Sequence, residues 1–429
     1  MHKQEPLLPE HTSNLGRRDL LKGLVAIAAG GAVSGICQTS LYASALQPYS
    51  PAILPEGVRS RFVESVNGIR MHALEGGYEE RNRPVVVLLH GFPELAYSWR
   101  KVMSGLSAAG FHVIAPDLRG YGRSSCTDVK YDDDLSDFRT FNMVTDVAGL
   151  VSAMGYKSVA AVVGHDFGSP LAAWCALTRP DVFHRLVMMS APFGGPPALP
   201  FDTADARDPA VTGKSAPDPI YQQLAELVPA RKHYQQYYTT RAANQNLWHA
   251  PQGLHDFLRA YFYMKSADWE GNKPHPLKAW TAEELAQVPR YYIMDLNQGM
   301  AETVARVMPS PAQITACRWL TEQDLNVYVA EYGRTGFQGG LQGYRVGIDW
   351  QNIRELRLFS GRTIDVPSLF IAGKSDWGVY QRPGAFEKMQ HEVCTQMHGA
   401  HLVAGAGHWV QQEQPEEVNR LLLSFLQAS

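Results

Sequence analysis

The chain has 429 residues, of which 45% are hydrophobic and 19% are charged, and it contains 37 glycines and 27 prolines. This composition is typical of a loop-rich globular protein and excludes a disordered, collagen-like or coiled-coil chain. The formal net charge is only −3, so nucleic acid is not an expected partner, because no basic field would gather its phosphates. The sequence has no C-x-x-C pair, H-E-x-x-H motif or phosphate-binding glycine loop, so we expect no metal and no organic cofactor.

The first 45 residues have the order of an export signal. Arg17 and Arg18 precede two leucines and a lysine, an Ala/Gly-rich apolar run follows at residues 24–36, and a small-residue cleavage site ends at Ala45. The paired arginines resemble the bacterial twin-arginine signal, so we expect residues 1–45 to be a signal peptide and the mature protein to be periplasmic or secreted. The apolar run is shorter than the about 20 residues of a membrane-spanning helix, so we expect no stable membrane span after processing. Cleavage would remove Cys37 and leave four cysteines whose pairing stays open: Cys126, Cys175, Cys317 and Cys394.

After the signal, the sequence predicts a hairpin and then alternating strands and helices. Asn67 and Gly68 separate two strand-like runs, residues 61–66 and 69–74, as the turn of a hairpin does. The apolar runs that follow are unbroken, which predicts strands covered on both faces and therefore an α/β fold with a mostly parallel sheet. We expect strands at 85–89, 111–115, 159–163, 184–189, 368–372 and 401–404, and helices at 99–106, 141–154, 170–176, 384–392 and 415–428.

This alternation is interrupted in the middle of the chain. After residue 192 the sequence becomes rich in Pro, Gly and Asp, and then, as far as residue 361, mainly helical and rich in Tyr, Trp and Gln. We interpret residues 193–362 as a helical cap inserted into an α/β core that consists of residues 46–192 and 363–429.

The strand expected at 159–163 runs directly into the sequence GHDFG at residues 164–168. This spacing is typical of the nucleophile elbow of an α/β hydrolase, where small residues permit a sharp turn that exposes the central side chain. Here the central residue is Asp166, which leaves an ester after attack on an sp³ carbon, whereas a serine would leave an ether that water does not readily hydrolyse. Asp166 therefore indicates epoxides or alkyl halides as substrates, although an aspartate at this place can also be a simple helix N-cap.

Two other residues follow strands in the order expected for a catalytic triad. Asp376 comes after the strand expected at 368–372, and His408 comes after the one at 401–404. Both lie at the carboxyl ends of strands, where an open α/β sheet places its ligand. We expect His408 to take a proton from water while Asp376 fixes its tautomer.

The loop HGFP at residues 90–93 follows the first buried strand. The backbone N–H groups of Phe92 and Phe167 are therefore candidates for an oxyanion hole. The alternative is a tight turn whose glycine and proline only shape the backbone.

Several motifs occur together: HGFPE at residues 90–94, a Trp-Arg pair at 99–100, DLRGYG at 117–122 and GHDFG at 164–168. As a set they resemble the α/β-hydrolase-fold epoxide hydrolases, closest to the soluble plant and mammalian type, over nearly all of residues 61–429. The resemblance implies that fold with a helical cap, an epoxide and water as substrates, and a vicinal diol as product.

In that family the cap supplies two tyrosines that hold and protonate the epoxide oxygen. The segment FQGGLQGYR is similar to the stretch that carries one of them and implies Tyr344, and the segment HYQQYY likewise implies Tyr234. A phenol of pKa about 10 suits this task, because it is neutral at pH 7 yet can protonate an alkoxide. Cap tyrosines can also be plain core aromatics, and the alternative donors are Tyr237, Tyr238, Tyr261 and Tyr263.

The chain departs from the family pattern in three respects. Phe167 stands where many members have Trp, the cap is longer with a Pro-rich start, and an export signal is present. A haloalkane dehalogenase shares the fold and the aspartate but binds halide through an aromatic N–H, which Phe167 lacks and which Trp377 or Trp409 would have to supply. A non-catalytic binding protein of this fold is a further alternative, although it would not need a complete set of catalytic groups. The sequence does not predict the oligomeric state.

Overall fold

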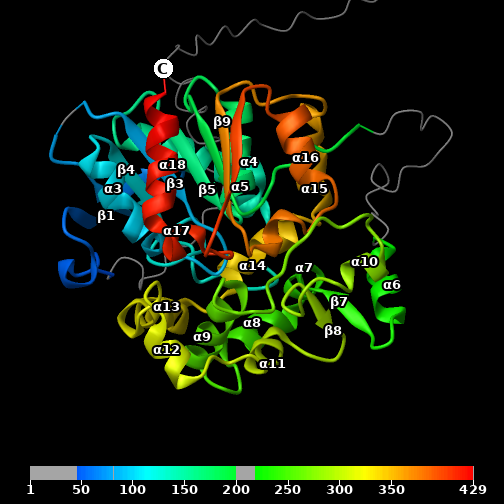
Figure 1. Ribbon diagram of the computed structural model, residues 1–429. Coiled ribbons are helices and arrows are strands. Elements are labelled where there is room, and N and C mark those ends of the chain that lie inside the picture. Colours follow the sequence, from blue (N-terminus) through cyan, green and yellow to red (C-terminus); the bar gives the residue numbers. More distant parts are fainter. Residues whose placement is uncertain (1–45, 81, 200–217, 429) are drawn as a thin grey trace, which may run out of the picture. The chain divides into compact units, whose positions relative to one another are not determined.

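The computed structural model describes residues 46–80, 82–199 and 218–428 (Figure 1). Its main sheet has eight strands in the order β1-β2-β4-β3-β5-β6-β9-β10. The predicted hairpin forms antiparallel strands β1 (Val58–Val66) and β2 (Ile69–Gly76), with Asn67 and Gly68 in the left-handed conformation of the turn. β2 pairs antiparallel with β4, and every other neighbouring pair from β4 to β10 is parallel. The bounds of these strands are β3 (Val85–Leu89), β4 (His112–Pro116), β5 (Ala161–His165), β6 (Leu186–Met189), β9 (Ser368–Gly373) and β10 (Met397–Val403).

Helices cover both faces of this sheet. The closing helix α18 (Pro415–Gln427) is an example, because its apolar residues recur along one side of the helix and are buried. Pro415 stands at the first position of this helix, where a backbone N–H would have no partner within the helix. The predicted α/β class with a mostly parallel sheet is thereby confirmed. The other core helices are α3 (Arg100–Ala108), α4 (Thr140–Ala153), α5 (Gly168–Thr178), α16 (Ala385–Lys388) and α17 (Val410–Glu413). α3 packs on α18, and α4 packs on α5. Short 3₁₀ segments are η1 (Pro51–Ile53), η2 (Ala96–Trp99), η3 (Ser136–Phe138), η4 (Arg357–Phe359) and η5 (Trp377–Val379), and η6 (Met389–Val393) is a π-helix.

The chain between β6 and β9 is mainly helical (green to yellow in Figure 1), but it also contains a two-stranded sheet that the sequence pattern did not predict. The strands of this sheet are β7 (Arg231–His233) and β8 (Ile293–Asp295). The cap boundaries at 193 and 362 stay predictions. The helices are α6 (Ile220–Glu226), α7 (Tyr234–Tyr238), α8 (Arg241–Trp248), α9 (Leu254–Lys265), α10 (Ala282–Leu285), α11 (Met300–Ala305), α12 (Pro311–Ala316), α13 (Glu322–Thr335), α14 (Gln338–Val346) and α15 (Trp350–Leu356).

A buried polar cluster joins α13 to the core. The Arg100 Nε–H donates to Asp324 Oδ1 at 2.8 Å, and the Tyr97 hydroxyl donates to the same oxygen at 3.0 Å. Arg100 Nη1 also donates to Gln412 Oε1 at 2.9 Å. Asp324 Oδ2 in turn caps its own helix by accepting from the Thr321 N–H at 2.9 Å. Because these groups are shielded from water, the cluster contributes to stability only while every partner is present.

Cys175, Cys317 and Cys394 are free thiols, whereas Cys126 is disulfide-bonded, so these four cysteines do not pair with one another. The expected signal peptide, residues 1–45, lies outside the described residues. In the part of the chain that the structure describes, no helix has the length and apolar character needed to cross a membrane.

Candidate active site

Asp166 occupies a sharp turn between β5 and α5. Its φ of 52° lies in the left-handed region, which is rare for residues other than glycine and is tolerated where the surroundings hold it in place. The flanking glycines have a steric reason. A Cβ on Gly164 would lie 1.8 Å from the Gly168 carbonyl oxygen, and a Cβ on Gly168 would lie 2.2 Å from the Leu89 carbonyl oxygen. The turn therefore places Asp166 directly after the end of β5, and side chains are excluded at the two glycine positions, Gly164 and Gly168.

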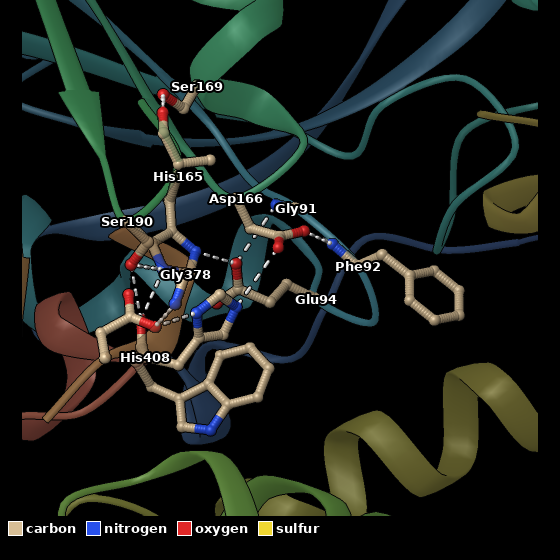
Figure 2. A network of polar contacts seen from close by, with 12 residues as sticks. Gly91, Phe92, Glu94, His165, Asp166, Ser169, Ser190, Gly378 and His408 are labelled. Carbon is tan, nitrogen blue, oxygen red and sulfur yellow. Dashed lines mark hydrogen bonds and ion pairs between the residues drawn. The ribbon is translucent and has the colours of Figure 1, made fainter. Parts of the chain in front are cut away.

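The structure brings the three predicted triad residues together (Figure 2). His408 Nε2 lies 3.3 Å from Asp166 Oδ2, and His408 Nδ1 lies 3.1 Å from Asp376 Oδ1. The same Asp376 oxygen accepts the Gly378 N–H at 2.7 Å. His408 and Asp376 are each only 1% exposed. One imidazole ring thus spans two carboxylates, of which Asp376 is buried and Asp166 is partly exposed.

The two oxygens of Asp166 have different partners. Oδ1 accepts the Phe92 N–H at 2.9 Å, whereas Oδ2 faces His408 (Figure 2). Phe92 follows Gly91, where a Cβ would come within 2.3 Å of the Asp166 Cβ, so only glycine permits this approach. The Phe167 N–H, which follows Asp166 in the chain, stays a predicted second donor. The two oxygens are therefore not equivalent, because the backbone holds Oδ1 whereas the His408 side chain faces Oδ2.

Both acidic members of the triad are held ionised. Burial opposes the charge of Asp166, but the hydrogen bond to His408 and the positive charge of Lys265 outweigh it and hold the pKa of Asp166 well below its usual value. Burial likewise opposes the charge of Asp376, and the interactions with His408 outweigh it and lower the pKa of that carboxyl. A carboxylate nucleophile is thus ready at neutral pH without deprotonation.

Glu94 and His165 form an ion pair behind the triad. Glu94 Oε2 lies 2.5 Å from His165 Nδ1, and His165 Nε2 lies 2.7 Å from the His408 carbonyl oxygen (Figure 2). Because both ring nitrogens face acceptors, His165 fits its charged form. Burial disfavours that charge, but Glu94 outweighs it and raises the pKa of His165. Both residues lie within sequence motifs, HGFPE and GHDFG, but the motifs alone predicted no role for either. The signal that could have identified them is a polar residue at the end of, or just after, each of two buried apolar strands, β5 for His165 and β3 for Glu94.

Tyr344 lies on α14, whose backbone packs directly on the loop after β4. A Cβ on Gly339 would lie 2.0 Å from the Gly120 carbonyl oxygen, so the two glycines permit this close approach. As a result, the ring centre of Tyr344 lies 5.5 Å from the ring centre of Phe92 and 4.6 Å from that of Phe167. Tyr344 therefore packs against both residues predicted to form the oxyanion hole.

Tyr234 begins α7, and its ring lies 6.0 Å from that of Tyr344. Both tyrosines interact electrostatically with Asp166, and burial raises the pKa of each phenol well above its usual value, so both hydroxyls keep their protons at neutral pH. Among the alternative donors, Tyr237 donates to Asn246 Oδ1 at 2.8 Å, and Tyr263 accepts from Gln313 Nε2 at 2.8 Å. The hydroxyls of Tyr238 and Tyr261 lie 3.5 Å apart, and the ring centre of Tyr238 lies 4.8 Å from that of Tyr344.

A cavity of about 320 Å³ lies beside this site, between α14 and the core. Its lining is mostly apolar, and Phe167 forms part of its wall together with Gly343 and Trp174. A Cβ on Gly343 would lie 3.3 Å from the Phe167 ring, so the missing side chain there helps to keep the space open. Asp166, His408, Tyr234 and Tyr344 are not among the lining residues, so the cavity adjoins the site through Phe167 rather than containing the reacting groups.

The fold and the arrangement of Asp166, His408 and Asp376 are those of an α/β hydrolase, and residues 84–415 match the model of the alpha/beta hydrolase fold family. Epoxide hydrolase B of Mycobacterium tuberculosis is 35% identical and covers 84% of this chain and 96% of its own, and epoxide hydrolase A of that bacterium is 30% identical and covers 86% and 98%. A solved epoxide hydrolase from an endophytic Streptomyces is 31% identical with a TM-score of 0.65, over 87% of this chain and 96% of its own. The chain belongs to the epoxide hydrolases of this fold and is a hydrolase.

Proposed function

We propose that this protein opens an epoxide to a vicinal diol in two steps, through an ester on Asp166. The observation that carries the proposal is the division of labour at the Asp166 carboxylate. One oxygen is held by the Phe92 N–H and the other faces His408, and the two buried tyrosines, Tyr234 and Tyr344, interact electrostatically with the same carboxylate. An enzyme that cleaved carboxylic esters would need a serine at this place.

In the first step, Asp166 Oδ2 attacks one epoxide carbon and forms a carbon–oxygen bond while the ring carbon–oxygen bond breaks. The leaving oxygen takes a proton from the hydroxyl of Tyr344 or Tyr234. Two neutral phenols suit this step because they donate hydrogen bonds to the oxygen as its negative charge develops.

In the second step, His408 Nε2 removes a proton from water, and the hydroxide adds to the Asp166 carbonyl carbon. The charge collects on Oδ1, where the N–H groups of Phe92 and Phe167 act as donors. Collapse of this intermediate breaks the bond between the carbon and Oδ2, and His408 returns its proton to the leaving oxygen. The carboxylic acid left at Asp166 then loses its proton, which restores the hydroxyl of the tyrosine that donated in the first step, and the diol leaves. Asp376 holds the ring of His408 in the required tautomer and stabilises its charged form.

We also propose that the protein is exported from the cytoplasm. The order of charges, apolar run and small residues in residues 1–45 supports a twin-arginine signal and a periplasmic or secreted protein. Expression of the full chain in a bacterium, with and without substitution of Arg17 and Arg18 by lysine, tests this. We expect the unsubstituted chain outside the cytoplasm with its N-terminus after Ala45. An uncut chain that stays in the cytoplasm in both cases would refute it.

The chemistry is tested by the intact mass of a His408→Gln variant after exposure to a small epoxide and, separately, to a matching bromoalkane. Loss of the base should trap the ester, so we expect an adduct with the mass of the whole epoxide and none from the bromoalkane. Asp166→Ala is the matched control and should give no adduct. An adduct from the bromoalkane alone would indicate a dehalogenase. Of the two candidate halide donors, the Trp409 indole N–H already donates to the Phe262 carbonyl oxygen at 2.8 Å, whereas the buried Trp377 indole N–H has no hydrogen-bond partner among the described residues, so the bromoalkane experiment discriminates between the two functions.

A further inference from the structure

Lys265 is a buried cation next to the triad. It is the last residue of α9 and only 3% exposed, and its carbonyl oxygen accepts the His408 N–H at 2.9 Å. Burying a lysine ammonium is unfavourable unless other groups compensate for the lost water. At Lys265 the compensating groups are aromatic rings and the carboxylates of the site.

Three aromatic rings surround the Lys265 ammonium. Its nitrogen lies 5.1 Å from the ring centre of Trp409, 5.2 Å from that of Tyr292 and 5.5 Å from that of Tyr261. These are cation–π distances, and the attraction is strongest where water is excluded. Among residues 46–80, 82–199 and 218–428, no carboxylate forms a direct ion pair with Lys265, so its charge is not neutralised locally.

The charge of Lys265 therefore extends to the acidic groups of the site. The Trp409 ring, which lies 5.1 Å from the ammonium, is itself 4.6 Å from the His408 ring, so the charge lies beside the triad. The carboxylates that act on Lys265 are those of Asp166, Asp376 and Glu94. Burial lowers the pKa of Lys265, and these three carboxylates act against that shift. In the opposite direction, Lys265 is among the groups that hold the pKa of Asp166 low.

We propose that Lys265 is a positioning residue that favours hydrolysis of the Asp166 ester over its formation. The proposal rests on the two-step reaction above. Asp166 is negative at rest, neutral in the ester and negative again when water has added to it. A fixed cation nearby stabilises the first and third states but not the second. It therefore favours the tetrahedral intermediate relative to the ester and gives no help to the first step.

The backbone at Lys265 can stay in place when its side chain is changed. A Cβ on Gly407 would lie 2.5 Å from the Ser266 carbonyl carbon, so the end of α9 packs closely on the loop of His408. Glu413 Oε2 accepts both the Ala267 N–H at 2.8 Å and the Gly407 N–H at 2.9 Å, which ties the two segments together. A Lys265→Met substitution therefore removes the charge and leaves these contacts in place.

The test compares Lys265→Met with the wild type by rapid mixing with excess enzyme, acid quench and intact mass, which follows ester formation and decay separately. We expect ester decay to slow roughly tenfold, which corresponds to about 1.4 kcal/mol of lost transition-state stabilisation, while ester formation is unchanged or faster. At steady state kcat and KM should then fall together, with kcat/KM maintained. Lys265→Arg keeps the charge and should restore the ratio of the two rates.

Several outcomes decide the matter. A fall in the rate of ester formation with no change in its decay would overturn the proposal, as would equal losses in both steps. Lys265→Gln serves if the methionine variant does not fold, with the same expectation. If the wild type forms no ester from any epoxide, the proposed function itself fails. If ester forms and decays at unchanged rates in the uncharged variants, only the role of Lys265 is refuted.

Discussion

Asp324→Asn should be strongly destabilising, because it breaks the buried cluster between α13 and the core. The substitution leaves the guanidinium of Arg100 buried with only neutral acceptors, and removing one partner of a buried ion pair costs about 3 to 5 kcal/mol. It also places an amide NH₂ against the Thr321 N–H, and losing such a helix cap costs about 1 kcal/mol. The asparagine oxygen can still accept from Arg100 and Tyr97, and Arg100 keeps its bond to Gln412, which offsets about 1 to 3 kcal/mol, so we expect about 3 kcal/mol in total.

Urea unfolding followed by circular dichroism measures this loss, and a double-mutant cycle isolates the pair. Arg100→Met together with Asp324→Leu replaces both charges by apolar groups, and we expect the double variant to be more stable than either single one. A loss below about 1 kcal/mol for Asp324→Asn would refute the reasoning, as would costs that simply add in the double variant. Either result would mean that water reaches Arg100 and that the pair is not buried in solution.

Three other predictions concern the site. Tyr344→Phe or Tyr234→Phe should slow ester formation roughly 100-fold, as measured by rapid quench, and an unchanged rate in both would exclude them as donors. Glu413→Gln removes one acceptor from the backbone around His408, so kcat should fall roughly tenfold with little change in KM. Burial opposes the charge of Asp376, but His408 lowers its pKa in the folded state, so the unfolded chain takes up that proton first as the pH falls below about 4. Stability should therefore drop below that pH, and urea midpoints should show a smaller drop in Asp376→Asn.

The triad was predictable because its signals are local. Asp166, Asp376 and His408 each follow an apolar strand within a few residues, and the carboxyl ends of parallel strands meet at one edge of the sheet. The tyrosines were not predictable in this way. Tyr234 and Tyr344 lie on different helices, and only resemblance to a family distinguished them from the other tyrosines of the cap.

The supporting groups escaped prediction because their partners are distant in the chain. Glu94 accepts from Gln411, which lies 317 residues away, and nothing in the sequence around either residue predicts that contact. Lys265 ends an amphipathic helix, where a lysine is ordinarily exposed and interacts with the helix dipole. Its burial depends on the ring of Tyr261, one turn earlier on the same helix, and on the rings of Tyr292 and Trp409 from two distant segments. Short strands β7 and β8 were missed because three residues are too few to establish an alternating pattern.

The unequal hydrogen bonding of the Asp166 oxygens bears on the origin of the oxygen atoms in the product. Since the bond to Oδ2 breaks in the second step, the diol carries away an atom of the protein, and the atom from water remains in Asp166. Oδ1 stays on the Phe92 N–H throughout. In heavy-oxygen water, repeated turnover should therefore renew one carboxylate oxygen at every cycle and leave the other as it was when the chain was synthesised. Each molecule of the enzyme would hold a single heavy atom at Asp166, and two would mean that the carboxylate rotates between cycles.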